Sequence, residues 1–211
     1  MDLVPSETDI PSRSIVAFPE RKIISNVAVS EVYLDGKLKK AELTGEDQKS
    51  FGIFMHSLIL SNYAEVMKVD NDVDIIGDDY EKAIFHYTAS KGFDKKLIDS
   101  IAPRVTEFTF EYENNLKVST HLINEKMRII SKGTPDLLLK RCTYVLQDSR
   151  FVKVTRKVFR EVNDVMKGML QRCISVYAIA IKDISKISEV LSTDAYVNEM
   201  TLVALVGMSR A

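Results

Sequence analysis

The hydrophobic positions of this chain follow a two-residue period in some stretches and a helical period in others. Two β-prone runs between Val27 and Leu43 flank Asp35-Gly36, a pair that tolerates the positive φ of a tight turn. This pattern predicts a β-hairpin. Residues 105–112, 116–123 and 126–131 alternate polar and apolar side chains and are separated by short polar turns, which predicts an antiparallel meander.

Helical spacing and capping signals predict the remaining elements. Phe51, Phe54 and Leu58 recur on one helical face, with Thr44 as a candidate N-cap, and Asp78 is the candidate N-cap of the next helix. The predicted helices cover residues 46–67, 79–91, 94–101, 136–144 and 155–171, and two further predicted strands cover residues 174–181 and 202–208. Short hairpins mixed with helix pairs favour an α+β fold, in which helices flank a twisted antiparallel sheet.

Composition and charge exclude several classes of protein. The 29 Lys and Arg residues balance 30 Asp and Glu residues, so the chain lacks the basic footprint of a dedicated nucleic-acid binder. Cys142 and Cys173 lie far apart, without the spacing of a zinc site, and are predicted to be buried thiols. Apolar stretches fall short of the ~20 residues that span a bilayer, and the first residues do not resemble a signal peptide. We therefore expect no membrane insertion and no structural metal.

An acidic cluster before the second predicted helix invites a calcium interpretation. Its members occupy the ligand positions of an EF-hand loop: Asp70, Asp72, Asp74, Asp78 and Glu81. Ile75, however, stands where that loop requires glycine, and Gly77 comes two places late. The alternative is a solvated acidic loop that leads into a capped helix, and the sequence favours it.

The sharpest local feature is Lys132-Gly133-Thr134-Pro135-Asp136, where a strand is predicted to turn into a helix. Pro135 suits the first helical position, and a lysine beside a glycine at such a turn can bring an ammonium and bare backbone to an anionic group. The alternative from the residues alone is a capped turn with an exposed lysine.

Several stretches resemble, in order, motifs of the nucleotide-binding domain of P-type cation-transporting ATPases. Lys132-Gly133-Thr134-Pro135-Asp136 resembles the K-G-A-P-E motif of that family. The other similar stretches are Gly77 to Ala83 (G-D-P-T-E-x-A), Phe110 to Ser119 (F-[ND]-S-x-x-K-x-x-x-S), Ser175 to Ala180 (R-V-L-A-x-A), and Leu202 to Met208, the strand leading back to the phosphorylation domain. The resemblance covers roughly Asn26 to Met208.

The resemblance implies an antiparallel sheet flanked by helices that holds ATP. Phe110 matches the aromatic residue that stacks on adenine, and Lys132 and Gly133 would line the adenine pocket. Asp78 matches the acid near the adenine amino group. Lys117 shares a strand face with Asn115 and Ser119, so it would enter the same pocket.

The chain also departs from the family pattern at two binding positions. The pocket lysine of the family aligns with Asn115, which leaves Lys117 as a substitute, and the arginine that faces the phosphates aligns with Ser175. Arg172 would have to replace that arginine. Each lost charge-assisted contact costs about tenfold or more in affinity, so we expect weak ATP binding.

The D-K-T-G-T signature of the phosphorylated aspartate is not present in the sequence. We predict a leader at residues 1–26, where that signature would lie, a nucleotide-binding domain at 27–208 and a tail at 209–211. No residue is predicted to be catalytic, and Mg²⁺ would bind only in a full-length parent.

Two functions remain open from the sequence. The first is an ATP-binding cytoplasmic domain of a P-type ATPase or ATPase-like membrane protein in the haloacid dehalogenase-like superfamily, monomeric by itself, with phosphorylation and actuator domains as partners. The second is a degenerate scaffold for protein contacts or for sensing another ligand.

Overall fold

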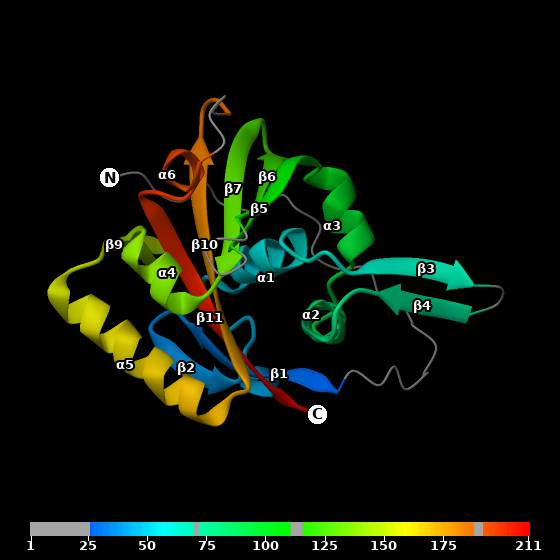
Figure 1. Cartoon of the computed structure of the whole chain (residues 1–211), viewed down its shortest axis with the longest axis horizontal. Helices are drawn as coiled ribbons and strands as arrows, with labels where there is room; N and C mark the ends of the chain where they lie inside the picture. The colour runs from blue at the N-terminus through cyan, green and yellow to red at the C-terminus, as the bar shows by residue number, and fades with distance from the viewer. Residues whose placement is uncertain (1–25, 70–71, 111–115, 188–191) are drawn as a thin grey trace.

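A nine-stranded sheet forms the centre of the domain (Figure 1). The computed structural model describes residues 26–69, 72–110, 116–187 and 192–211. Within these residues the main path of the sheet runs β2-β1-β11-β10-β7-β6-β5, and β8 extends it by pairing in parallel with β11. All other neighbouring strands are antiparallel. The α+β prediction is therefore confirmed.

The strands of this sheet are β1 (Val27–Leu34), β2 (Lys37–Lys40), β5 (Arg104–Phe110), β6 (Leu116–Ile123), β7 (Lys126–Gly133), β8 (Cys142–Gln147), β9 (Arg150–Lys153), β10 (Ser175–Ile184) and β11 (Met200–Arg210). The predicted hairpin is β1–β2, and its turn places Asp35 and Gly36 at φ values of 52° and 74°. The predicted meander is β5–β6–β7. Strand β11 extends to Arg210, which lies in the predicted tail.

Helices cover both faces of the sheet. One face carries α1 (Phe51–Leu60), α2 (Asp79–Ser90) and α3 (Lys95–Ile101), whose apolar side chains share a core cluster with Ile130 and Ile179 of the sheet. The other face carries α4 (Pro135–Lys140), α5 (Arg156–Arg172) and α6 (Thr193–Tyr196), which pack on Leu116, Val118 and Ala178. Because strand side chains alternate, the central strands β6, β7, β10 and β11 supply residues to both clusters. We call them the α2 face and the α5 face of the sheet.

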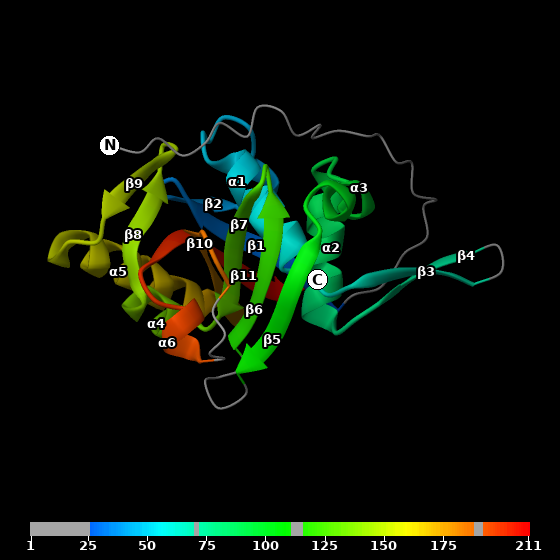
Figure 2. The same ribbon diagram turned by 90° about the horizontal axis from the view of Figure 1, so that it is seen from above.

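The long predicted helix over residues 46–67 is wrong in both extent and cap. Helix α1 spans only residues 51–60, and Thr44 does not cap it, because its hydroxyl donates to the carbonyl of Lys40. Asn62 ends the helical run, since its side-chain oxygen accepts from the Ala64 N–H and its amide donates to the Glu81 carbonyl. Strand β3 (Glu65–Val69) follows and pairs with β4 (Asp72–Ile76). The β3–β4 ribbon projects from the side of the domain that carries α2 (Figures 1 and 2).

The predicted helix over residues 136–144 is also too long. It ends at Lys140, and residues from Cys142 form β8. Thr143, Tyr144 and Val145 are β-branched or aromatic residues that suit a strand. The helices predicted at 79–91, 94–101 and 155–171 are confirmed as α2, α3 and α5, and Asp78, Asp94 and Thr155 supply the side-chain caps.

The calcium alternative does not fit this structure. Asp72 and Asp74 lie in a paired strand rather than in a binding loop, and Asp78 is the N-cap of α2. Glu81 points to two lysines. Asp70 lies outside the described residues. Among the residues that the structure describes, no group of three or more His, Cys, Asp or Glu side chains is arranged to hold a metal ion.

Both cysteines are free thiols. Cys142 is buried, and burial raises the pKa of its thiol to about 12, while Cys173 is only half-buried. No helix in the described part of the chain is both long and apolar enough to cross a membrane.

Candidate functional site

The predicted site residues lie on both faces of the sheet. Lys117 on β6 is opposite Lys132 on β7, and Lys132 is opposite Ile179, a member of the core cluster on the α2 face. Phe110 packs instead with the cluster on the α5 face. The structure therefore separates the predicted adenine-stacking residue from the predicted pocket lysines by the thickness of the sheet.

Gly133 also belongs to the α5 face. It is the last residue of β7, one place after Lys132, so the strand alternation turns it to the opposite side. A Cβ at this position would lie 2.8 Å from Cδ1 of the fully buried Leu116. The glycine is thus needed for the close packing of β6 on β7. Lys132 and Gly133 are strand residues, not part of the predicted turn.

A buried cluster of two lysines and one carboxylate lies between α2 and the sheet. Nζ of Lys132 lies 2.7 and 2.9 Å from the two carboxylate oxygens of Glu81, and Nζ of Lys117 lies 2.9 Å from Oε1. The side chains of Lys132 and Glu81 are 4% and 5% exposed, whereas that of Lys117 is 29% exposed. Of these three side chains, that of Lys117 is therefore the most accessible to solvent.

Burial and mutual electrostatics act in opposite directions on Glu81 and Lys132. Burial by itself would raise the pKa of Glu81, but the two lysines outweigh it and hold that pKa below its ordinary value. Burial lowers the pKa of Lys132, and Glu81 opposes the change. Two amines therefore share one carboxylate, and the negative charge of Asp78 also acts on Lys132.

Tyr63 covers the lysines from the end of α1. The centroid of its ring lies 5.0 Å from Nζ of Lys117 and 5.7 Å from Nζ of Lys132, and the guanidinium carbon of Arg104 lies 4.5 Å away. Its backbone N–H donates to Oε2 of Glu81 at 3.1 Å. Burial raises the pKa of the Tyr63 hydroxyl to about 12, so this ring stays neutral.

Two more aromatic rings and a hydroxyl lie beside the cluster. Tyr80 of α2 and Tyr177 of β10 are half-buried, with ring centroids 5.7 Å apart in an edge-to-face arrangement. Burial raises the pKa of Tyr177, a change that its hydrogen bond with Ser175 opposes and that Asp78 and Glu81 reinforce. Ser175 therefore belongs to the α2 face.

Asp78 acts as the N-cap of helix α2. Its exposed carboxylate accepts the Glu81 N–H at 2.8 Å and so caps α2. The acid that meets the predicted pocket lysines is Glu81, three residues later. The sequence contained a signal for it, because Glu81 is the glutamate within the stretch that resembles G-D-P-T-E-x-A. Tyr63 had no comparable signal, since it lies outside every stretch that resembles a family motif.

Asn115, which aligns with the family's pocket lysine, and Arg172, the candidate substitute for the family arginine, have other outcomes. Asn115 lies outside the described residues. Arg172 does not reach the α2 face, because it lies at the end of α5 and makes a two-point ion pair with Glu31 of β1, with both nitrogen–oxygen distances 2.9 Å. The missing phosphate-facing arginine is therefore not replaced by Arg172.

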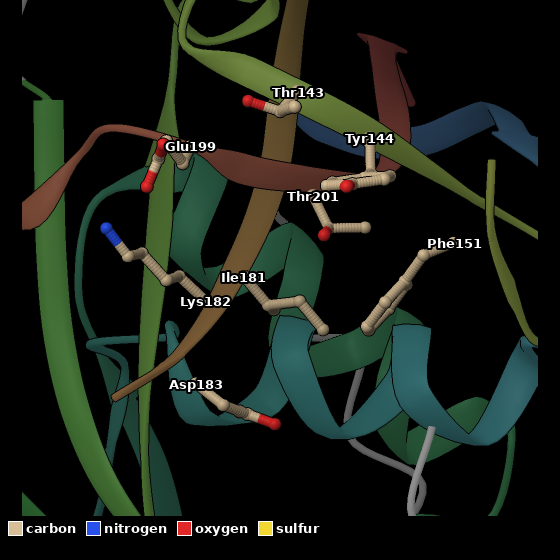
Figure 3. Close-up of a pocket in the computed structure, with 8 residues that line it drawn as sticks. All are labelled: Thr143, Tyr144, Phe151, Ile181, Lys182, Asp183, Glu199 and Thr201. Carbon is tan, nitrogen blue, oxygen red and sulfur yellow. The ribbon is translucent and has the colours of Figure 1, made fainter. Parts of the chain in front are cut away.

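Two cavities lie elsewhere on the domain. The larger, of about 410 Å³, is lined by Thr143, Tyr144, Phe151, Ile181, Lys182, Asp183, Glu199 and Thr201 (Figure 3). The smaller, of about 210 Å³, lies between α5 and the sheet beside Tyr33 and Glu161. None of the predicted site residues lines either cavity.

The fold and the ordered motifs define a cytoplasmic domain of the P-type ATPase kind, and comparison with known proteins shows the family. The family described as P-type ATPase, cytoplasmic domain N, matches residues 50–210. The chain belongs to this family.

The similar curated proteins are much longer transport ATPases. The chain is 26% identical over 174 residues to Calcium-transporting ATPase 1 of Lactococcus lactis, a match that covers 82% of this chain and 19% of that protein. It is 21% identical over 184 residues to Calcium-transporting ATPase 1 of Bacillus cereus, covering 87% of this chain and 20% of the relative. It is 27% identical over 160 residues to Cation-transporting ATPase pma1 of Synechocystis, covering 74% and 16%. The chain thus spans about a fifth of the length of these relatives.

Proposed function

We propose that this domain binds an adenine nucleotide on the α2 face of the sheet, with Lys117 meeting the phosphates. The observation that carries the proposal is the charge cluster of Lys117, Lys132 and Glu81, in which two amines share one carboxylate and the amine of Lys117 is partly exposed. An anionic ligand gains most from a cation that is partly desolvated yet reachable. Membership in the N-domain family supports the choice of ATP among anions.

On the α2 face, Tyr80 or Tyr177 would stack on the adenine in place of Phe110. Phe110 lies on the other face, whereas Tyr80 and Tyr177 present half-buried rings beside the charge cluster. Either ring offers a surface for a purine, and stacking of a nucleobase on an aromatic side chain is worth about 1–3 kcal/mol. Lys132 and Glu81 stay buried behind Lys117, and Ser175 stands near the phosphates as a neutral hydrogen-bonding group.

Replacing Lys117 with glutamine is expected to weaken ATP binding about tenfold, because one charge-assisted contact with phosphate is lost. The measurement is an ATP titration followed by backbone amide NMR shifts. Lys126→Gln is the matched control, because Lys126 is exposed at the opposite end of β7. Equal affinity of the Lys117 and Lys126 variants for ATP would refute the phosphate contact.

Replacing Phe110 with alanine is expected to change stability rather than binding. The ring packs 5.1 Å from that of Phe108 and is half-buried, so its loss should lower the free energy of unfolding by about 1–2 kcal/mol. The affinity for ATP should stay within twofold of the parent domain, roughly the limit of such a titration. Urea unfolding and the ATP titration are the two measurements. A collapse of ATP affinity in a folded variant would restore Phe110 to the site.

A scaffold without nucleotide binding is the second candidate function. It is favoured by the ion pair of Lys132 with Glu81, which satisfies both groups internally, and by Ser175 at the position of the family arginine. The two candidates separate in one titration: absence of amide shifts near Lys117 and Tyr177 at millimolar ATP supports the scaffold.

In a longer parent protein, we propose that the domain presents ATP to an aspartate on a phosphorylation domain. The D-K-T-G-T sequence is not part of this chain, so the domain binds nucleotide without forming the aspartyl phosphate itself. Mg²⁺ would then be shared between the phosphates and the phosphorylation domain. Incubation of the domain with ATP labelled on the γ-phosphate tests this step, and covalent labelling of the domain alone would contradict it.

A further inference from the structure

The charge cluster on the α2 face places two amines against one carboxylate. Lys117 and Lys132 share Glu81, and Lys132 is almost completely buried. An unbalanced charge in a buried position is costly unless other groups compensate for it. Asp78 contributes negative charge near Lys132, and a second group near both amines would add to it.

The ring of Tyr63 is the neighbouring group with suitable chemistry. The face of an aromatic ring carries negative partial charge and attracts cations within about 6 Å of its centroid. Nζ of Lys117 and of Lys132 both lie within that range, at 5.0 and 5.7 Å. The ring attracts both amines, and it also contacts the guanidinium of Arg104, whose central carbon lies 4.5 Å from its centroid.

The backbone around Tyr63 holds this ring in place. The Tyr63 N–H donates to the Glu81 carboxylate, and the Asn62 amide donates to the Glu81 carbonyl. From the other side, the guanidinium of Arg104 donates to the carbonyls of Leu60 and Asn62. These hydrogen bonds connect the turn after α1 to α2 and to β5, and they fix the position of the ring relative to the lysines.

The two lysines differ in how tightly they are held. Lys132 contacts both oxygens of Glu81, whereas Lys117 contacts one oxygen and is more exposed. A lysine side chain held by one oxygen alone would sample many rotamers and lose that freedom on binding a ligand. The ring restricts Lys117 before any ligand arrives.

We propose that Tyr63 is a positioning residue that pre-orients Lys117 for a phosphate-bearing ligand. The inference rests on the proposed nucleotide function and adds a residue that no family motif in this sequence includes. It assigns the effect to the aromatic ring rather than to the hydroxyl, because the ring faces the amines.

The first test needs no ligand. Ring current from Tyr63 should move the NMR signals of the Lys117 side-chain methylene next to the amine upfield of those of an exposed lysine such as Lys126. The same signals should move back in Tyr63→Leu and stay in place in Tyr63→Phe. Lys117 signals at exposed-lysine positions in the parent domain would overturn the proposal.

The second test measures ligand affinity. Tyr63→Leu should weaken binding of ATP and of inorganic triphosphate about fivefold, and Tyr63→Phe should bind both as the parent domain does. Adenosine, which carries no phosphate, should bind equally to all three. Tyr144→Leu is the matched control, because Tyr144 is an exposed aromatic residue in the distant cavity of Figure 3.

The outcomes separate the two proposals. Parent-like ATP binding by Tyr63→Leu overturns the positioning role and leaves the nucleotide function intact, and equal weakening in Tyr63→Phe overturns the assignment to the ring. Absence of ATP and triphosphate binding in every form, including the parent domain, overturns both proposals.

Discussion

Replacing Glu81 with alanine is expected to lower the free energy of unfolding by about 3–5 kcal/mol, the range found when one member of a buried ion pair is removed. Lys132 is 4% exposed and would lose both of its oxygen contacts. It would then either stay charged without a counterion or release its proton, and both states cost free energy. The N–H of Tyr63 would lose its acceptor as well. Guanidinium unfolding at neutral pH, followed by circular dichroism, measures the change.

Glu107→Ala is the matched control for this experiment. Glu107 also pairs with a basic residue, Arg104, but its side chain is 51% exposed, so its removal should cost less than about 1 kcal/mol. A double change of Glu81→Leu with Lys132→Met should recover much of the lost stability, because it removes both buried charges together. Equal stability losses for Glu81→Ala and Glu107→Ala would show that the cluster is not a buried charge network.

The elements that the sequence predicts well are those with local signals. Asp35-Gly36 determines a hairpin turn by its backbone preference, and Asp78 caps α2 through a bond within one turn. Strand β8 and the early end of α1 depend on distant partners: β8 pairs with β11, and Asn62 binds the carbonyl of Glu81. Tertiary contacts of this kind override local helical patterns, and no window of sequence contains them.

The candidate site was predictable only in part for the same reason. The order of the motifs identifies Lys132 and Lys117 as site residues, and strand alternation predicts that both lie on one face of the sheet, as their pairing confirms. It does not show which face Phe110 takes, because the pairing of Phe110 with Leu116 in the β5–β6 register sets that face. The partner of Lys132 comes from α2, fifty-one residues away in sequence, and the covering ring of Tyr63 comes from the turn after α1. Only the folded chain brings these groups together.

Acidification from pH 7 to pH 4 is expected to remove roughly 3 kcal/mol of stability through His121 alone. This histidine is 1% exposed, and burial lowers its pKa from 6.5 to about 4. The hydrogen bond to the Ala102 carbonyl opposes that shift, and the charge of Arg104 reinforces it. Because the folded pKa is depressed, the unfolded chain binds more protons between pH 6.5 and pH 4. The stabilising contribution is therefore complete above pH 6.5 and is lost as the pH falls toward 4.

Carboxylates also titrate toward pH 4, so the informative quantity is a difference between variants. The free energy of unfolding of the parent domain minus that of His121→Gln should fall by roughly 3 kcal/mol between pH 7 and pH 4. His86→Gln is the control, because His86 is only half-buried and the downward shift of its pKa comes from burial and from Lys82. Urea unfolding across this pH range provides the measurement. The opposite outcome is a difference between the parent domain and His121→Gln that does not change with pH. It would mean that protonation of His121 in the folded domain costs no free energy. That result would contradict the buried position of His121 between Ala102 and Ser119.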